Sequence, residues 1–245
     1  MKAIILAAGK GTRLECESSD LPKALRLLGG KPLIRYVLDS LDFLSPEDIT
    51  IVVGFLKEQV METIGGGYHY VEQRELNGTA KATLCAETIL GNFLGPIIVC
   101  YCDMPFLSRK TYQSMFAKHM ETGAGNTLLA GRMHPIPPFG RFIRDEENRL
   151  YDVVEDSACT DVQKQIDEVN VGLQVVDSPR LWTWLRKVDN INPKREYYLT
   201  GLVRVLAAEG VRQEVVTLEN QNEMLGINTI DDLRAAEALL RRTRG

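Results

Sequence analysis

Hydrophobic residues in the first hundred positions alternate between short continuous runs and a helical spacing. Four of the runs have the length of buried strands: residues 3–7, 49–53, 68–72 and 97–101. Three stretches with apolar residues every three or four positions lie between them: residues 32–41, 56–64 and 79–90. Strands that alternate with helices in this way predict a Rossmann-like α/β fold, with a mixed, mainly parallel sheet and helices on both faces.

The pattern becomes mixed beyond Ser108. Further strands are expected at residues 126–131, 141–144, 150–154, 169–176 and 215–218, and further helices at 181–188 and 199–209. Thr229 and Asp232 form a capping-box pattern that opens a final helix. We therefore predict one main domain over residues 1–228, with a C-terminal helix over residues 229–245 that packs on this domain or extends from it.

The loops after the predicted strands are where a ligand is expected, because sheets of this type bind ligands at the carboxyl ends of their strands. The first such loop is Gly9-Lys10-Gly11-Thr12-Arg13. Its glycines free backbone N–H groups to approach an anion, and Lys10 and Arg13 add positive charge. The spacing matches neither the dinucleotide-binding glycine pattern nor the Walker pattern, so the loop alone supports a tight turn as well as a phosphate site.

Two further residues could act together with that loop. Lys23 follows the stiff Pro22, and Asp103 follows the predicted strand at residues 97–101. A carboxylate at the end of a buried strand is a preferred ligand of a hard divalent cation, together with phosphate oxygens. Taken singly, Lys23 is equally typical of a solvated surface, and Asp103 of a residue that begins a helix before Pro105.

Taken together, these segments resemble the signature of the sugar-1-phosphate nucleotidyltransferase family, in which L-A-A-G-x-G-T-R is followed by P-K. The matching residues of this chain are Leu6-Ala7-Ala8-Gly9-Lys10-Gly11-Thr12-Arg13 and Pro22-Lys23. Within the family, the resemblance is greatest to the uridylyltransferase domain of the bifunctional bacterial enzyme that forms UDP-N-acetylglucosamine. It continues over nearly the whole chain, in residues 73–82, 139–142, 153–155, 168–172, 196–200 and 226–228.

The resemblance implies the nucleotide-diphospho-sugar transferase fold and a set of site residues. The residues implied to bind the nucleotide are Leu6, Ala7, Ala8, Gly9, Gln73, Gly78 and Thr79. Those implied to surround the sugar phosphate are Gly140, Glu155, Asn170, Tyr198 and Thr200. The implied catalytic residues are Arg13, Lys23 and Asp103, and the implied ligands of a Mg²⁺ cofactor are Asp103 and Asn228.

The implied reaction transfers a nucleotidyl group, UMP from UTP, to a sugar 1-phosphate, N-acetylglucosamine 1-phosphate, and releases pyrophosphate. The chain departs from the family pattern in four places. The loop between Arg13 and Pro22 is longer, Cys102 replaces a glycine, Lys81 replaces a histidine and Gly201 replaces an aspartate. These departures leave open another sugar phosphate or phosphocholine, with CTP or dTTP as the donor. They also leave open a catalytically silent regulatory protein that binds a sugar nucleotide.

Two other activities are not expected. An NAD-binding oxidoreductase would share the fold class, but its fingerprint requires a glycine spacing that this chain lacks. An acetyltransferase of the kind joined to the bifunctional enzyme would need the hexapeptide repeats of a left-handed β-helix, which the sequence does not contain.

Composition and charge restrict the partners. The formal net charge of −4 provides no basic surplus for nucleic acid, and the hydrophobic fraction of 44% suits a globular protein. No apolar stretch reaches the roughly 18 residues that span a membrane, and Gly9 cuts short the apolar start of the chain, unlike a secretory signal. Five scattered cysteines are typical of free thiols in a reducing compartment. We expect a cytoplasmic monomer or weak homo-oligomer whose partners are a nucleoside triphosphate and a sugar 1-phosphate, with neither nucleic acid nor membrane.

Overall fold

The computed structural model describes residues 1–14 and 21–244, with only the backbone of residues 13, 243 and 244. Its strands are β1 (Lys2–Leu6), β2 (Leu27–Leu28), β3 (Lys31–Pro32), β4 (Ile49–Val53), β5 (His69–Glu72), β6 (Pro96–Tyr101), β7 (Asn126–Arg132), β8 (Arg141–Arg144), β9 (Leu150–Val154), β10 (Glu168–Asp177) and β11 (Gln213–Thr217). Its α-helices are α1 (Leu33–Ser40), α2 (Lys57–Ile64), α3 (Thr79–Cys85), α4 (Glu87–Leu90), α5 (Arg109–Thr122), α6 (Ser178–Lys187), α7 (Leu202–Ala208) and α8 (Ile230–Arg244).

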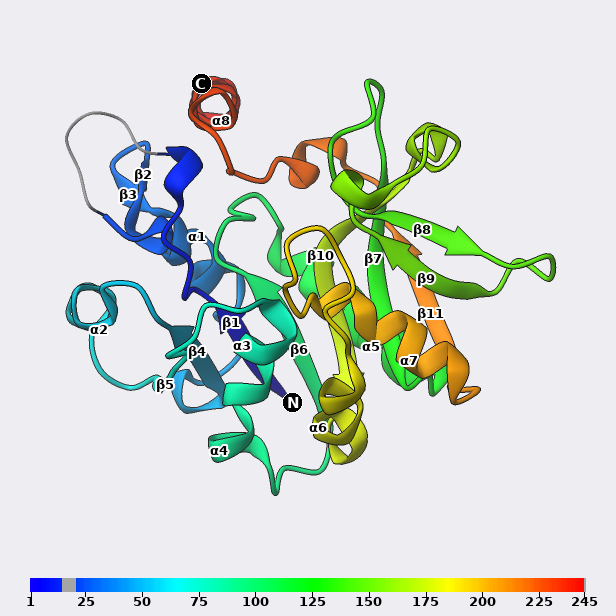
Figure 1. Ribbon diagram of the computed structural model, residues 1–245. Helices are drawn as coiled ribbons and strands as arrows, with labels where there is room; N and C mark the ends of the chain where they lie inside the picture. The colour runs from blue at the N-terminus through cyan, green and yellow to red at the C-terminus, as the bar shows by residue number, and fades with distance from the viewer. Residues whose placement is uncertain (15–20, 245) are drawn as a thin grey trace.

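Nine of the described strands form one mixed sheet, which confirms the predicted fold class (Figure 1). Its main path runs β11-β7-β10-β6-β1-β4-β5, and the β8–β9 hairpin branches from β10. Strands β6, β1, β4 and β5 pair in parallel. Strand β10 runs antiparallel between β6 and β7, so its N-terminal half lies beside the carboxyl end of β6. The ligand-binding edge of the parallel strands therefore includes residues from an antiparallel neighbour.

Helices cover both faces of the sheet because successive strand residues point in opposite directions. Ala3 and Ile5 of β1 belong to a buried cluster that includes residues of α1, α2 and α5. Ile4 and Leu6 belong to the opposite cluster, which includes residues of α3, α4, α6 and α7. Burial of apolar side chains on both faces explains why the parallel strands are continuous apolar runs instead of alternating ones.

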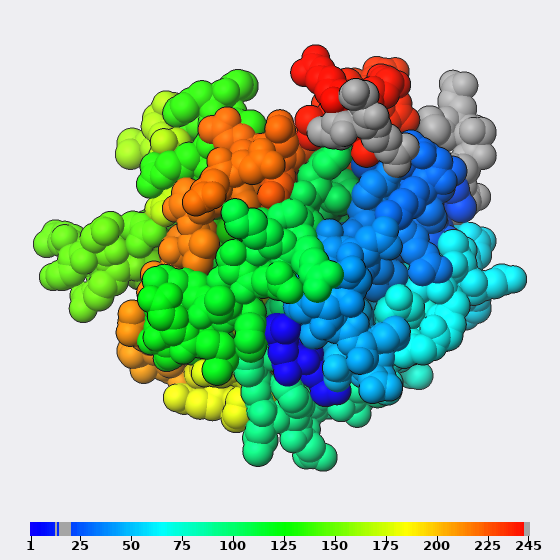
Figure 2. Space-filling model, turned by 180° about the vertical axis from the view of Figure 1, so that it is seen from behind, coloured from blue at the N-terminus to red at the C-terminus, as the bar shows by residue number. Residues whose placement is uncertain are grey.

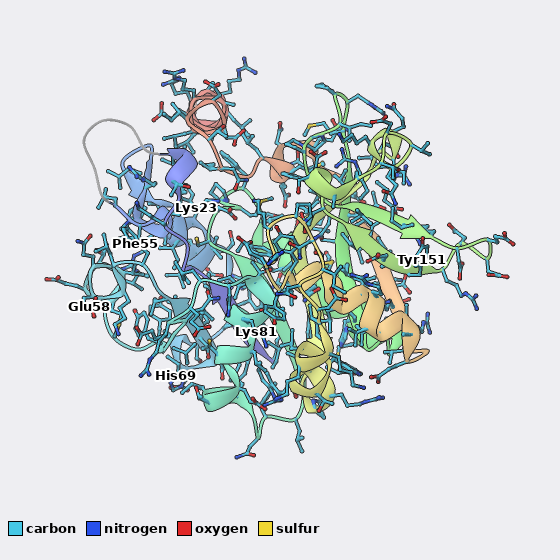
Figure 3. The ribbon with its side chains drawn as sticks, in the orientation of Figure 1. Lys23, Phe55, Glu58, His69, Lys81 and Tyr151 are labelled. Carbon is cyan, nitrogen blue, oxygen red and sulfur yellow. The ribbon has the colours of Figure 1, made fainter. Side chains whose placement is uncertain are left out.

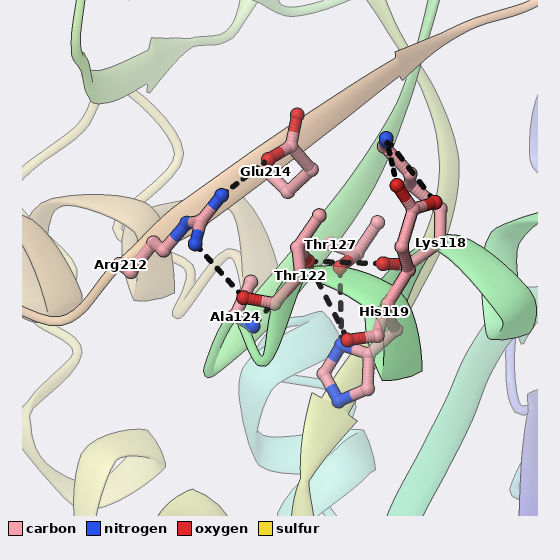
Figure 4. A network of polar contacts seen from close by, with 8 residues as sticks. Lys118, His119, Thr122, Ala124, Thr127, Arg212 and Glu214 are labelled. Carbon is pink, nitrogen blue, oxygen red and sulfur yellow. Dashed lines mark hydrogen bonds and ion pairs between the residues drawn. The ribbon is translucent and has the colours of Figure 1, made fainter.

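Helix α5 was not predicted, because its buried stripe is narrow: Tyr112, Met115 and His119. Its ends carry clear local signals, since Ser108 accepts a hydrogen bond from the Thr111 amide and Gly123 adopts φ +61°. Figure 4 shows its C-terminal end, where His119 Nδ1 and Thr127 Oγ1 of β7 lie 3.0 Å apart in a hydrogen bond. The helix is thus tied to the sheet by a polar contact that hydrophobic periodicity does not reveal.

Two predicted helices are divided in the structure. The stretch at 79–90 is interrupted at Ala86 and forms α3 and α4. The stretch at 199–209 begins as a 3₁₀ turn, η6 (Leu199–Gly201), before α7 continues it. Residues of both segments pack in the same buried cluster on one face of the sheet.

The C-terminal helix begins at the predicted capping box. Asp232 Oδ2 accepts hydrogen bonds from the backbone N–H of Asn228 at 3.0 Å and of Thr229 at 2.8 Å, and Asp232 donates its own amide to Thr229 Oγ1 at 3.2 Å. Helix α8 buries Ala236 in a small apolar cluster with Leu28 and other residues near the chain start. Figure 2 shows α8, in red, at the upper edge of the molecule, above the blue surface of the segment that contains β2, β3 and α1. The division at residue 228 stays a prediction.

Among the described helices, none combines the length and the apolar character needed to cross a membrane. The predictions of a cytoplasmic location and of a monomer or weak oligomer stay predictions.

Gly78 fixes the start of α3, and its replacement should destabilise the fold. Its φ of +123° is one that other residues rarely adopt, and an added Cβ would lie 2.4 Å from the carbonyl oxygen of Tyr197. We expect Gly78→Ala to lower the free energy of unfolding by about 2–4 kcal/mol in urea denaturation. Gly66→Ala is the matched control, since nothing lies within 4 Å of its added Cβ. Equal stability of the two variants would contradict this account.

Candidate active site

Three segments that are far apart in the sequence meet at the carboxyl ends of β1 and β6. The Cys102 amide donates to the Leu6 carbonyl at 3.2 Å, which joins the end of β6 to the end of β1. The Lys23 amide donates to the Gly9 carbonyl at 3.3 Å. The Ile227 amide donates to the Asp103 carbonyl at 2.9 Å, which brings in the segment before α8. Backbone contacts alone therefore place the loop after β1, Lys23, Asp103 and Asn228 in one place.

The side chains of Lys23, Asp103 and Asn228 converge at this junction, and we call them the cation cluster. Lys23 Nζ forms a short ion pair with Asp103 Oδ2 and donates a hydrogen bond to Asn228 Oδ1 at 2.7 Å. The side chains of Lys23 and Asp103 are only 15% and 17% exposed. Figure 3 places Lys23 beside the end of β1, below α8. One carboxylate oxygen and one amide oxygen thus enclose a single positive charge.

Glycines make the close approach of these segments possible. Gly11 has φ +74°, and an added Cβ there would lie 2.9 Å from the Cβ of Lys23. At Gly226 an added Cβ would lie 2.7 Å from the Met104 sulfur, next to Asp103. A larger residue at position 11 would press on Lys23, and one at position 226 would require the Met104 side chain to move. The Arg13 side chain and most of the lengthened loop, residues 15–20, lie outside the described residues.

The donor set of the cation cluster fits a hard cation. Both oxygens already contact the same ammonium nitrogen, which occupies the position that a metal ion bound to Asp103 and Asn228 would take. A carboxylate and an amide oxygen leave most of a coordination shell to phosphate oxygens and water, as Mg²⁺ prefers. Within the described chain there is no group of three or more His, Cys, Asp and Glu side chains that could hold a metal without such help.

The first four residues implied to bind the nucleotide, Leu6 to Gly9, form the end of β1 and the start of the first loop. Leu6, Ala7 and Ala8 are buried, whereas Gly9 is exposed with no atom within 4 Å of an added Cβ. Ala8 accepts a hydrogen bond from the Phe55 amide at 3.0 Å, which ties the loop to the segment after β4. The loop is therefore held at its base and open at its tip.

Gln73, Gly78 and Thr79 form a second wall of that region. Gln73 is 6% exposed, and its Nε2 donates to the Gly78 carbonyl at 3.0 Å. Thr79 Oγ1 accepts a hydrogen bond from the Leu199 amide at 2.8 Å. The start of α3 is thus joined on one side to β5 and on the other to the segment that carries Thr200.

The residues implied to surround the sugar phosphate form a second group. Thr200 Oγ1 donates to Glu155 Oε1 at 2.9 Å. The Asn170 amide donates to the Gly140 carbonyl at 2.8 Å, and Asn170 Oδ1 accepts from the Gly172 amide at 3.2 Å. An added Cβ on Gly140 would lie 3.7 Å from Glu155 Oε1, so this glycine borders the carboxyl group.

Burial raises pKa values in this second group. Burial raises the pKa of Glu155 above its ordinary 4.5, although the hydrogen bond from Thr200 opposes the shift. Burial, assisted by the charges of Glu196 and Glu155, also raises the pKa of Tyr198. A phenol with a raised pKa keeps its proton at neutral pH, so Tyr198 remains a hydrogen-bond donor there.

Tyr101 links the two groups and was not singled out from the sequence. It ends β6, and burial raises the pKa of its phenol, which also hydrogen-bonds the Thr79 side chain. The φ of +83° at Gly172 lets β10 pass close to the ring, because an added Cβ would lie 2.9 Å from Tyr101 Cδ2. The signal in the sequence was an aromatic residue two positions before Asp103 at the carboxyl end of a strand.

Two of the departures from the family pattern have a defined place. Cys102 is 4% exposed and packs in the core with Met104 and Leu107, and burial raises the pKa of its thiol to about 12. It therefore fills space beneath the cation cluster as a neutral apolar group. Lys81 Nζ lies 4.4 Å from the ring centre of Tyr197, a cation–π contact between α3 and the segment before η6 (Figure 3).

Comparisons with known proteins agree with this geometry. Residues 3–166 match the family described as the MobA-like NTP transferase domain. The chain is 32% identical to the bifunctional protein GlmU of Streptococcus gordonii over 98% of its length, and 34% identical to that of Exiguobacterium sibiricum over 98%. It is 33% identical to that of Alkaliphilus metalliredigens over 99%. The chain spans about half the length of these relatives, 52–53% of each.

The raised pKa of Glu155 predicts a pH-dependent stability. Because the folded state holds this proton more tightly than the unfolded chain, stability falls as pH rises from about 4.5 through the folded pKa. We expect Glu155→Gln to have a higher Tm than the wild type at pH 7, and the difference to vanish near pH 4.

Glu209→Gln is the control of opposite sign for that measurement. Hydrogen bonds from Lys187 and Trp184 lower the pKa of Glu209, so its charge stabilises the fold above the ordinary pKa of 4.5. This variant should have a lower Tm than the wild type at pH 7 and approach it in acid. A Tm for Glu155→Gln that stays at or below the wild-type value at pH 7 would refute the assigned burial effect.

Proposed function

We propose, because the chain belongs to the family of MobA-like NTP transferase domains, that it transfers a nucleotidyl group from a nucleoside triphosphate to a sugar 1-phosphate. The products would be a nucleotide sugar and pyrophosphate. The observation that carries this proposal is the cation cluster beside the open glycine loop at the carboxyl end of β1. Two anionic substrates need a site of this kind, where charge is neutralised and glycines let the backbone come close to an anion.

The specific substrates we propose are UTP and N-acetylglucosamine 1-phosphate. The support for them is the motif resemblance, which covers both the nucleotide side and the sugar side of the site. Bifunctional GlmU proteins are 32–34% identical to this chain over the matched part, which is about half of each. We propose that the reaction takes place in the cytoplasm.

The chemistry follows from the charges of the reactants. An oxygen of the sugar 1-phosphate attacks the α-phosphorus, a new P–O bond forms, and the bond to the β-phosphate oxygen breaks so that pyrophosphate leaves with the electron pair. The attacking phosphate is already ionised at pH 7, so no strong general base is required. The task of the protein is to align two anions and to offset their repulsion. Lys23 and Arg13 would supply positive charge, and the loop at residues 9–11 would supply backbone donors.

Lys23 has a second task in this proposal. Asp103 and Asn228 would hold Mg²⁺, which when bound supplies positive charge to the phosphates. Lys23 Nζ now contacts both of these oxygens, so it must give up that position and turn toward a phosphate when substrates enter. The flexible stem of a lysine and its rotatable donors permit this movement.

The sugar end of the site would be set by hydrogen bonds. Glu155, already oriented by Thr200, would accept from a sugar hydroxyl, and Asn170 and Tyr198 would offer further polar contacts. Tyr101 stands between the sugar group and the nucleotide group through its contact with Thr79. This arrangement would place the attacking phosphate near the cation cluster and the sugar ring near β10.

Pyrophosphate release across a panel of substrates tests the function. We expect magnesium-dependent release from UTP with N-acetylglucosamine 1-phosphate, at a higher kcat/KM than from CTP, GTP or dTTP with glucose 1-phosphate or phosphocholine. A maximum at another pair would keep the reaction class and replace the substrates. Binding of a sugar nucleotide without turnover of any pair would contradict the proposal and favour the regulatory protein.

Variants of the cation cluster are the control for that assay. Asp103→Asn and Lys23→Ala should each lower kcat/KM by at least about 100-fold, because charge stabilisation by positioned groups has effects of this order. Lys2→Ala removes the ion pair in which Lys2 Nζ and Asp48 Oδ1 lie 2.8 Å apart, distant from the site. This variant should keep the wild-type turnover to within about twofold. Near-normal turnover of the Asp103→Asn or Lys23→Ala protein would remove these residues from the mechanism.

A further inference from the structure

A small pocket lies beneath the proposed sugar site, between the end of β6, β10 and η6. It contains about 220 Å³ of empty space including its mouth, and its closed end has room for about one water-sized group. Its lining includes Tyr101, Asn170, Gly172, Gln174, Leu199 and Thr200. Two of these residues, Asn170 and Thr200, belong to the proposed sugar site, so the pocket is continuous with it.

Gln174 is a buried polar side chain in this lining with an unused donor. It is 5% exposed, and its Nε2 has no hydrogen-bond partner among the described residues. The residues paired with Gln174 in the two adjacent strands are Val99 of β6 and Leu128 of β7, and both are buried and apolar. A buried amide without a partner destabilises a fold, and native structures hold few of them. The position therefore needs an explanation beyond packing.

The path of β10 directs Gln174 to the pocket. Val169, Val171, Leu173 and Val175 pack in the cluster on the opposite face of the sheet. Alternate residues of a strand point to opposite faces, so Gln174 shares its face with the site residue Asn170. The pairing register with β7 shifts between these two positions, as expected where a bulge re-aims a side chain beside a site.

We propose that the Gln174 amide selects the sugar substrate by donating a hydrogen bond to one of its oxygen atoms, a hydroxyl or an acyl carbonyl. This inference rests on the proposed transfer to a sugar 1-phosphate. A single oxygen matches the size of the closed end of the pocket, and an acceptor matches the unused N–H donor. An analogue that lacks this oxygen would leave the buried amide unpaired in the complex. Its kcat/KM would be lower than that of the parent sugar phosphate for that reason.

The distribution of polar groups favours a sugar oxygen over a phosphate oxygen as the acceptor. None of the residues that line the pocket is cationic, Gln174 is neutral, and the residues paired with it on both sides of β10 are apolar. Glu155, hydrogen-bonded to Thr200 at the pocket, would repel a phosphate but accept from a neutral sugar. The closed end of the pocket is thus suited to an uncharged oxygen.

The test pairs substrate analogues with a variant. The substrate is the sugar 1-phosphate with the highest kcat/KM in the panel, with a set of analogues that each lack one oxygen-bearing group. For N-acetylglucosamine 1-phosphate these are glucosamine 1-phosphate and the 3-, 4- and 6-deoxy compounds. The wild type should lose on the order of 10- to 100-fold in kcat/KM with one of them. With the parent compound, Gln174→Leu should have a kcat/KM below that of the wild type by a similar factor. With that one analogue, the kcat/KM of Gln174→Leu should be no lower than its kcat/KM with the parent compound.

Two more variants make the outcome specific. Gln174→Met also removes the donor and keeps the length of the side chain, so it serves if Gln174→Leu does not fold. Thr50→Val is the matched control, because Thr50 Oγ1 of β4 is likewise buried and has no described partner, but it does not line the pocket. Thr50→Val should keep the wild-type discrimination among all analogues, and every variant should keep the wild-type KM for the nucleotide.

The result that overturns the inference is full wild-type discrimination at every position in both Gln174 variants, which would assign the amide to a bound water or to packing alone. That result leaves the proposed function intact, because the enzyme is then active on its sugar phosphate. If none of the sugar 1-phosphates in the panel supports pyrophosphate release by the wild-type protein, the proposed function is wrong, and this inference is wrong with it.

Discussion

The contact of Lys23 with Asp103 and Asn228 is the interaction on which the site depends. It joins residues that are 80 and 205 positions apart, and it does so at the point where β1 and β6 end side by side. An ammonium held by a carboxylate and an amide has its charge balanced without full burial. This contact fixes the segment before α8 against the first loop, and Gly11 supports it because a side chain at its φ of +74° would be strained and would press on Lys23.

The proposed sugar side of the site depends on a different feature, the antiparallel strand β10 within a mainly parallel sheet. A parallel strand would present its carboxyl end to the ligand, but β10 presents residues from its N-terminal half and its middle, from Asn170 to Gln174. Asn170, Gly172 and Gln174 therefore lie along the wall of the site, not at its edge. The positive φ at Gly172 and the shift in register next to it allow this wall to approach Tyr101 closely.

The sequence was sufficient for the nine strands of the main sheet and for the end of the sheet that carries the candidate site, because most of the buried parallel strands are apolar runs with distinctive loops after them. It did not predict the two-residue strands β2 and β3, which are too short to show a pattern. It was not sufficient for α5, since its buried face is a narrow stripe and its anchor to the sheet is His119, a polar residue. Nor could it show that Lys23 and Asn228 touch, because no local pattern relates positions so far apart. Gln174 was hidden for a related reason: within the run at 169–176, one polar residue does not disturb the strand pattern, and only the pocket shows what faces its amide.

The central claim is that Asp103 and Asn228 form a cation site whose position Lys23 Nζ occupies in the free protein. Titration with Mn²⁺, followed by the electron paramagnetic resonance signal of the free ion and without nucleotide, tests this claim most directly. Lys23→Ala should bind Mn²⁺ more tightly than the wild type, because the competing ammonium is gone while both oxygens remain, and the double variant Lys23→Ala/Asp103→Asn should lose that gain. Binding by Lys23→Ala that is no tighter than the wild type would contradict the claim.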